Sequence, residues 1–199
     1  MTVQHPLPPL FNERSRVLIL GSFPSVKSRE GMFFYHHPQN RFWKVLAAVF
    51  GCPVPETIEE KRRLILDHGL ALWDVIERCE IVGSSDASIR DAVPTDLSRI
   101  LDHAPIEAIF CNGSTAYRLY QKHQQSRTGL EARLLPSTST PMPPGSCPVW
   151  WKRGRWLERR REEDGGGTAV QRLLPSTGPD PPGVLFLRSD GSRPQTVRL

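Results

Sequence analysis

Short apolar segments alternate with segments of helical periodicity between residues 15 and 139, and this alternation constrains the fold of the 199-residue chain more than any other feature. Alternating strands and helices are typical of an α/β domain, in which a mostly parallel sheet carries helices on both faces. The spacing predicts strands over 16–20, 70–73, 106–111 and 132–135. Helices are expected over 41–50, from a capping box at Thr57 and Glu60 to Gly69, from a Thr95 cap to His103, and from a Ser114 cap to His123.

Parallel sheets bind their ligands where the strands end. The four expected strand ends are 21–24, 74–75, 112–113 and 136–139. Several residues near them have two local interpretations. Phe34 and Tyr35 fit a sheet core or a platform for a nucleic-acid base, and Asn40 fits a helix cap or a group that orients water or substrate. The Asn112 amide fits a capped turn or a contact to a base edge, because an amide both donates and accepts hydrogen bonds.

Composition divides the chain at residue 140. Pro and Gly make up about 28 % of residues 140–199, which is in the range of low-complexity sequence. The net charge of +5 suggests a nucleic-acid partner, but residues 1–139 carry +1 of it and residues 140–199 carry +4. The charge therefore says little about what the domain binds. We expect an N-terminal extension over 1–14, a domain over 15–139 and a tail over 140–199.

Several classes of protein are excluded by what the sequence lacks. No apolar run is long enough to span a membrane, and the N-terminal residues do not form a signal peptide. The four cysteines form no CxxC pair, and the adjacent His36 and His37 make a poor metal pair. GxSxG is also absent. We expect a cytoplasmic protein with no metal site and no membrane partner.

The segment GSFPSVKSREGMFFYHHPQNRFW over 21–43, with LWDVI, GSSDASIR, CNGSTAY and LLPSTS further on, resembles the uracil-DNA glycosylase superfamily. Within it, the hypoxanthine-DNA glycosylase branch is the most similar, and the likeness covers about 15–139. The resemblance implies a three-layer αβα fold around a four-stranded parallel sheet. It also implies a monofunctional, cofactor-free and monomeric enzyme of base excision repair. Such an enzyme hydrolyses the N-glycosidic bond of deaminated bases in double-stranded DNA, hypoxanthine first and uracil in mismatches second, and is nucleoid-associated when on DNA.

The resemblance also assigns roles to residues. It makes Asn40 catalytic and gives Asn112 the task of reading the base. Base-binding positions are Ser22, Phe23, Phe34, Tyr35 and Asn112, and DNA-backbone positions are Pro24, Ser25, Pro136, Ser137, Thr138 and Ser139. Where the uracil enzymes carry a water-activating Asp in the first motif, this chain has Ser22-Phe23-Pro24 and no acid. Where their second motif carries a His, it has Leu135, and both departures favour hypoxanthine over uracil alone.

The tail departs from the family pattern directly after Ser139, where relatives continue with Pro-Ala-Asn-Ala and an amphipathic helix. In the shifted reading frame, Met142-Pro143 must give Ala and Trp150-Trp151 must give Val. We therefore interpret the tail as the product of a single-base lesion near codon 140, which makes it non-native or disordered and removes the last helix. The alternatives are a natural divergent tail, a non-catalytic module that binds damaged DNA or nucleotides, and an inactive frameshifted glycosylase.

Overall fold

The computed structural model describes residues 2–139, and the tail and its reading-frame interpretation lie outside the described residues. The strands are β1 (Thr2–Gln4), β2 (Val17–Gly21), β3 (Leu70–Asp74), β4 (Ile76–Glu80), β5 (Arg90–Pro94), β6 (Ala108–Asn112) and β7 (Ala132–Leu135). The helices are α1 (Val26–Glu30), α2 (Phe42–Phe50), α3 (Ile58–Asp67), α4 (Ser98–Leu101), α5 (Ser114–His123) and α6 (Gln125–Thr128), with a 3₁₀ turn η1 (Asp86–Ser88).

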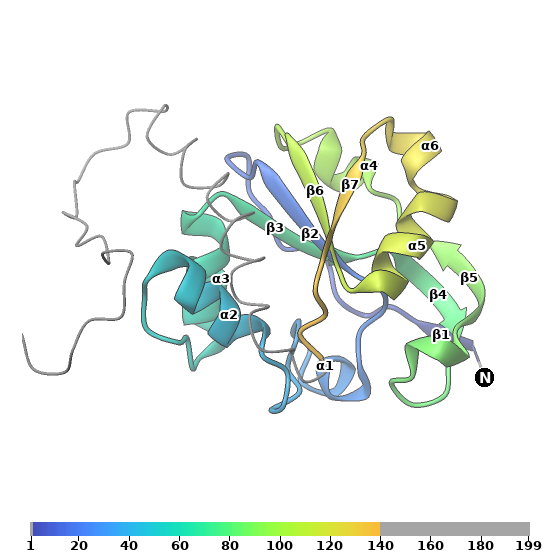
Figure 1. The fold of residues 1–199 in the computed structure, drawn as a ribbon, viewed down its shortest axis with the longest axis horizontal. Coiled ribbons are helices and arrows are strands. Elements are labelled where there is room, and N and C mark those ends of the chain that lie inside the picture. The colour runs from blue at the N-terminus through green and yellow to red at the C-terminus, as the bar shows by residue number, and fades with distance from the viewer. Residues whose placement is uncertain (1, 140–199) are drawn as a thin grey trace, which may run out of the picture. The chain divides into compact units, whose positions relative to one another are not determined.

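A four-stranded parallel sheet in the order β3-β2-β6-β7 forms the centre of the domain. Every residue of β2 and β3 is buried, as expected for strands that are covered on both faces. Figure 1 shows α2 and α3 on one side of this sheet and α5 with α6 on the other. The predicted α/β fold with four parallel strands is confirmed, and each strand lies within two residues of its expected bounds.

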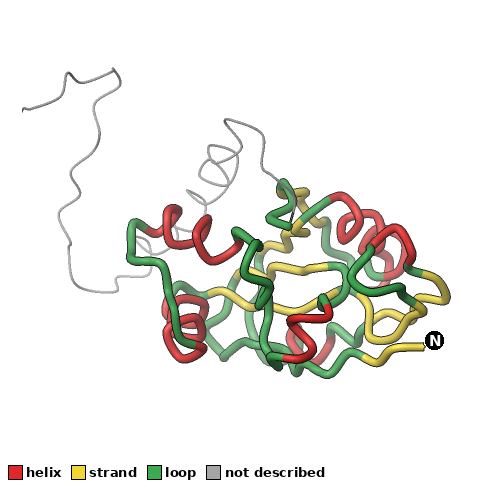
Figure 2. The backbone as a smooth tube through the Cα atoms, turned by 90° about the horizontal axis from the view of Figure 1, so that it is seen from below, coloured by secondary structure: helices red, strands yellow, loops and turns green. Residues whose placement is uncertain are grey.

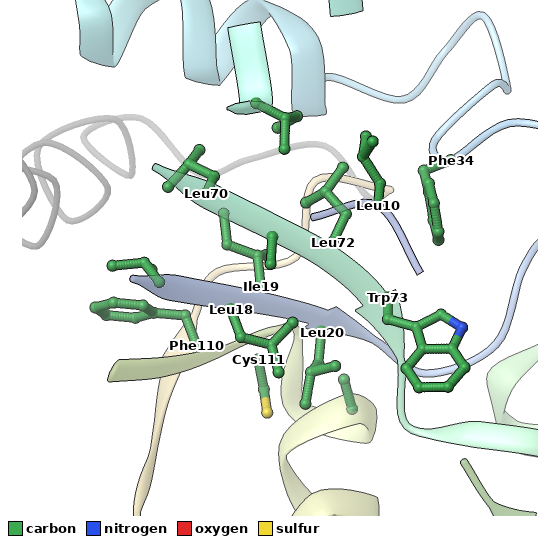
Figure 3. Close-up of a cluster of buried hydrophobic side chains, with 14 of the residues drawn as sticks. Leu10, Leu18, Ile19, Leu20, Phe34, Leu70, Leu72, Trp73, Phe110 and Cys111 are labelled. Atoms are coloured by element: carbon green, nitrogen blue, oxygen red, sulfur yellow. The ribbon is translucent and has the colours of Figure 1, made fainter. Parts of the chain in front are cut away.

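The core fills both faces of the sheet. Successive strand residues point to opposite faces, and Figure 3 shows Ile19 on one side of β2 with Leu18 and Leu20 on the other. Leu10 and Leu72 lie on the side of Ile19, and Cys111 lies on the side of Leu20. The exposed fraction of the side chains on β2 and β3 and of Leu10 in the N-terminal segment is at most 5 % for Leu10, Leu18, Ile19, Leu20 and Leu72. The packed sheet therefore gives a rigid base for the loops that follow its strands.

Two of the expected helix caps are wrong. Thr95 is buried and donates through Oγ1 to the carbonyl of Asp74 (2.8 Å), and α4 begins three residues later after Leu97. Ser114 is the first residue of α5 and makes no cap hydrogen bond, since Gly113 (φ 101°) takes the cap position. The predicted capping box of Thr57 and Glu60 is confirmed, with both of its reciprocal hydrogen bonds present.

A second, antiparallel sheet of order β1-β4-β5 was not predicted. Its strands are only partly buried, so they lack the continuous apolar runs that reveal β2 and β3. Figure 2 shows β1, next to the marked N-terminus, beside the other strands of this sheet. The segment that follows β1 enters the main core, where Leu7 and Leu10 are buried and Leu10 pairs with Leu72. The N-terminal residues thus lie beside β3, the edge strand of the parallel sheet.

Candidate active site at the carboxyl ends of the parallel strands

A pocket of about 350 Å³ lies where β2, β3 and β6 end. It gathers all but one of the residues that the sequence singled out. Those that line it are Ser22, Phe23, Pro24, Ser25, Phe34, Tyr35, Asn40, Asn112, Ser137, Thr138 and Ser139. Pro136 is half-buried just outside the pocket and does not line it. The structure therefore brings four separate loops together around one cavity.

Two carboxylates in this pocket were missed as site residues. The first motif carries no acid, yet Asp74 at the end of β3 and Asp86 in η1 both line the pocket. The sequence position of each carboxylate pointed to the site. Asp74 directly follows an expected strand, at the edge where ligands bind, and Asp86 lies within the GSSDASIR segment. The pocket therefore holds negative charge that comes from outside the first motif.

Gly21 allows the Asp74 carboxylate to lie against the end of β2. The parallel register pairs Gly21 with Asp74, and a Cβ atom on Gly21 would collide with Asp74 Oδ1. His5, from the N-terminal segment, holds the other carboxylate oxygen through a 2.8 Å contact between Nε2 and Oδ2. Only a residue without a side chain fits at position 21, because any larger residue would displace this carboxylate.

Asp86 is linked to the first motif by a hydrogen bond. Ser22 donates through Oγ to Asp86 Oδ1 at 2.7 Å. Partial shielding of the Asp86 carboxyl from water raises its pKa above the ordinary value, and the negative charge of Asp74 acts in the same direction. The hydrogen bond from Ser22 opposes this pKa shift without cancelling it. The hydroxyl proton of Ser22 is therefore committed to Asp86.

The aromatic residues of the 21–43 segment are buried except for Tyr35, which is partly buried, and three of them (Phe23, Phe34 and Tyr35) line the pocket. Phe34 is 4 % exposed, and Tyr35 stacks on Phe42 with ring centroids 3.8 Å apart. Tyr35 has a left-handed backbone (φ 50°), which is uncommon for an aromatic residue. Its hydroxyl is buried and makes no hydrogen bond with another residue in the described range. Burial raises the pKa of this hydroxyl, and the Asp74 charge raises it further, so it stays protonated.

Asn40 lies one residue before the N-cap of α2, which is Arg41, and its side chain still satisfies a backbone N–H of the first turn. Its Oδ1 accepts a 2.9 Å hydrogen bond from the backbone N–H of Phe42, although the helix itself begins after Arg41. A backbone N–H needs an acceptor, so the carbonyl end of the amide must face the helix. The NH₂ end has no partner among residues 2–139, and Asn40 lines the pocket. The cap interpretation and the functional interpretation are therefore compatible, with a donor left for the cavity.

Asn112 holds the loop after β7. Its Oδ1 accepts from the backbone N–H of Thr138 (3.1 Å), and its Nδ2 donates to Thr138 Oγ1 (2.9 Å). Thr138 is fully buried, and its carbonyl accepts from the N–H of Arg41 at the start of α2. One Nδ2 hydrogen of Asn112 remains for a ligand. Asn112 is therefore first a clamp between two strand ends, with part of its amide left to contact a base.

Hydroxyl groups line the outer part of the pocket. Ser137 and Ser139 share a 2.8 Å hydrogen bond between their Oγ atoms, and Ser139 is exposed. Ser25 caps α1 by accepting from the backbone N–H of Ser28. Within residues 2–139, no three His, Cys, Asp or Glu side chains gather as metal ligands. No helix of this described range is long and apolar enough to cross a membrane.

The chain is similar to known proteins over most of its length. The family model described as the Uracil DNA glycosylase superfamily matches residues 8–181. The chain is 29 % identical over 138 residues to a protein named hypoxanthine DNA glycosylase from Methanosarcina acetivorans, covering 69 % of this chain and 87 % of the relative. A protein of the same name from Methanosarcina barkeri is 30 % identical over 135 residues, covering 66 % and 84 %.

A solved structure is similar as well. It is the solution NMR structure of a candidate uracil DNA glycosylase from Methanosarcina acetivorans, with a TM-score of 0.69 and 28 % sequence identity. The match covers 79 % of this chain and 99 % of that chain. The similarity of fold therefore extends over almost the whole of the other protein.

Proposed function

This chain belongs to the uracil DNA glycosylase superfamily, and we propose that it removes hypoxanthine, and in second place mismatched uracil, from double-stranded DNA. The family makes it a DNA glycosylase, a hydrolase that acts on DNA. Hypoxanthine comes first because two similar proteins are named for that base. The absence of an acid from the first motif adds support, since the uracil enzymes carry an Asp there.

The proposed reaction is monofunctional hydrolysis of the N-glycosidic bond as the first step of base excision repair. The base is extruded from the duplex into the pocket. Unstacking and unpairing it require about a few kcal/mol of free energy, and least for a mispaired base. Phe34 contacts the face of the base, and Asn112 donates its remaining Nδ2 hydrogen to the base edge. Backbone N–H groups near Ser22 and Phe23 polarise a carbonyl of the base.

Asn40 is proposed to position the attacking water. Its NH₂ group is free of partners in the described range and lines the cavity, so it can donate to a water molecule there. The transition state of such hydrolysis is oxocarbenium-like, as in sugar hydrolysis. One preorganised donor of this kind contributes a factor of about 10²–10³. The hydroxyl groups of Ser25, Ser137 and Ser139 contact the phosphates on both sides of the extruded nucleotide.

One observation carries this proposal: residues from four strand ends meet in a single pocket that is large enough for a base. Its volume of about 350 Å³ lies within the usual range for small-molecule sites. The donors on its wall, from Asn40 and Asn112, match what a lactam base and a water molecule need.

Alkali-revealed strand cleavage under single turnover tests the proposal. The substrates are labelled duplexes with hypoxanthine, uracil or xanthine at one position, and the chain is assayed as written and with the frame restored after Ser139. Cleavage of the hypoxanthine duplex, faster than the others, is the expected result. Cleavage by neither chain, with the restored chain folded by circular dichroism, contradicts it and favours a module that binds DNA without cutting.

We also propose that the protein acts as a cytoplasmic monomer without a cofactor, and that it joins the nucleoid when bound to DNA. A pocket built from a single chain supports the monomer, because no second copy is needed to complete it. Sedimentation at micromolar concentration would contradict this if it gave twice the mass of 22.5 kDa.

A further inference from the structure

A buried His–Asp pair lies beside the pocket and has no task in the reaction described above. His5 Nε2 and Asp74 Oδ2 are 2.8 Å apart, and the two side chains are 2 % and 7 % exposed. Asp74 lines the pocket, whereas His5 lies behind it, edge-on to Phe23 and Trp73. Burial of an ionisable pair is expensive unless its hydrogen bonds are made, so the arrangement needs an explanation.

The hydrogen bonds around His5 fix its protonation. The backbone N–H of Leu7 donates to Nδ1 at 3.1 Å, so Nδ1 carries a lone pair and no hydrogen. The proton of the ring is therefore on Nε2, which donates it to Asp74 Oδ2. His5 in this arrangement is a neutral imidazole. It orients the Asp74 carboxylate through this hydrogen bond and brings no positive charge to it.

The second carboxylate oxygen lies at the end of β2. Asp74 Oδ1 occupies the space that a Cβ on Gly21 would take, and Gly21 also lines the pocket. Oδ1 has no hydrogen-bond partner among residues 2–139, and over the same residues Asp74 forms no ion pair with Lys or Arg. Besides His5, the protonated Tyr35 hydroxyl and the Asp86 carboxyl interact electrostatically with Asp74. Neither of them supplies a positive charge.

We propose that Asp74, oriented by His5, stabilises the positive charge that develops on the deoxyribose during base release. This inference rests on the glycosylase reaction proposed above. As the bond between C1′ and the base nitrogen breaks, its electron pair leaves with the base and the sugar becomes cationic. Water then bonds to C1′ and releases a proton to solvent, and the base anion takes up a proton from solvent. Asp74 forms no bond in these steps, and His5 acts as a positioning residue.

The physical basis is a fixed negative charge in a site from which the substrate excludes water. Coulombic attraction is several times stronger there than in bulk solvent, and a preorganised charge needs no rearrangement during the reaction. The Asp74 carboxylate also lies next to the first motif, where this chain has Ser22-Phe23-Pro24 in place of an acid. The missing acid is thus replaced in space from the neighbouring strand, through the gap that Gly21 leaves.

Binding to two abasic analogues tests the proposal without any chemical step. One duplex carries a neutral tetrahydrofuran residue, and the other carries a cationic pyrrolidine residue of similar shape. We expect the wild-type chain to bind the pyrrolidine duplex about 10²-fold more tightly, as transition-state analogues do. Asp74→Asn should leave the Kd for tetrahydrofuran unchanged and reduce the preference to about threefold or less, because Asn keeps the shape and loses the charge.

All affinities are measured at one ionic strength, because phosphate contacts make every Kd depend on salt. Two further variants serve as comparisons. Asp67→Asn removes an exposed carboxylate at the end of α3 and should keep the full preference. His5→Ala should reduce the preference partly, because Asp74 loses its orienting donor but keeps its charge. The melting of each variant by circular dichroism shows whether it is folded.

Equal affinity of the wild-type chain for the two analogues overturns the proposal, even if Asp74→Asn does not fold. An undiminished preference in a folded Asp74→Asn variant overturns it as well. Cleavage of the hypoxanthine duplex is measured alongside and separates the two hypotheses. If the wild-type chain cleaves this duplex and Asp74→Asn keeps the preference for pyrrolidine, the role of Asp74 is contradicted and the proposed hydrolysis stands. Absence of cleavage, with a preference that depends on Asp74, contradicts the proposed hydrolysis and supports the charge recognition.

Discussion

Asn112 and Thr138 are joined by two hydrogen bonds that tie the end of β6 to the loop after β7. Thr138 is in turn bonded through its carbonyl to Arg41 at the start of α2. One buried residue thus fixes the relative position of three walls of the pocket. A change in either partner should therefore affect stability and activity together, whereas a residue that only contacts the base would affect activity alone.

Asn112→Ala should destabilise the fold by about 1–3 kcal/mol, because it leaves the buried N–H of Thr138 without an acceptor. Thr138→Val keeps that N–H bonded and removes only the Oγ1 contact, so a loss of about 1 kcal/mol is expected. Urea unfolding gives both values, and single-turnover cleavage is measured beside it. If Asn112→Ala abolished cleavage and left the free energy of unfolding unchanged, Asn112 would be a base-reading residue and not a clamp.

Substitutions at Asn40 should separate two functions of its side chain: accepting from the Phe42 N–H and donating to the attacking water. Asp is as good a cap as Asn, so Asn40→Asp keeps the contact to the Phe42 N–H while it removes the NH₂ group. Asn40→Ala removes both. We expect each variant to lose at least about 10²-fold in single-turnover rate while still binding DNA, and only Asn40→Ala to lose about 1 kcal/mol of stability. A near wild-type rate for Asn40→Asp would exclude the amide donor from the mechanism.

Much of the fold could be predicted because the strands of the parallel sheet are buried on both faces. Such strands form unbroken apolar runs, as Val17–Gly21 and Leu70–Asp74 do. The antiparallel sheet escaped prediction because its strands mix exposed and buried residues without regular alternation. Thr95 and Ser114 were misplaced as caps for a related reason: a hydroxyl before a helix fits several local geometries, and tertiary contacts decide between them.

The pocket walls at 22–25, 112 and 137–139 were found because each follows a strand end, and parallel strand ends share one edge of a sheet. Phe34, Tyr35 and Asn40 do not directly follow a strand, and their roles came from the family resemblance. The pairing of His5 with Asp74 was not predictable in the same way. The two residues are 69 positions apart, and their contact depends on how the N-terminal segment lies beside the edge strand β3, where Leu10 pairs with Leu72. Likewise, sequence alone did not indicate that the Asn112 amide would form two hydrogen bonds with Thr138. Long-range side-chain pairing is a property of the packed fold.

Tyr35→Phe should have opposite effects on stability and on function. The hydroxyl is buried without a partner in the described chain, so its removal relieves a desolvation penalty, and the free protein should become equally stable or more stable. If the hydroxyl donates to the base, the same change should lower affinity for the hypoxanthine duplex by about tenfold, which is the loss of one hydrogen bond. Thermal melting and fluorescence titration check the two effects. Lower stability in Tyr35→Phe would mean that the hydroxyl is satisfied in the free protein.

Asp86 should make the stability of the fold fall as pH rises. Its pKa is higher in the folded protein than in the unfolded chain, chiefly because the carboxyl is shielded from water. A raised pKa means that the folded state holds the proton more tightly. The contribution to stability is therefore complete below the unfolded value of about 3.9 and is lost as pH rises through the folded value.

Asp86→Asn removes this titration and keeps an oxygen that can accept from Ser22. The difference in free energy of unfolding between the variant and the wild-type chain should thus grow in favour of the variant as pH rises from about 4 toward neutrality. Urea unfolding at a series of pH values measures it, and Asp102→Asn, which changes an exposed carboxyl, serves as the control. A difference that is constant with pH would show that Asp86 titrates alike in the folded and unfolded chain.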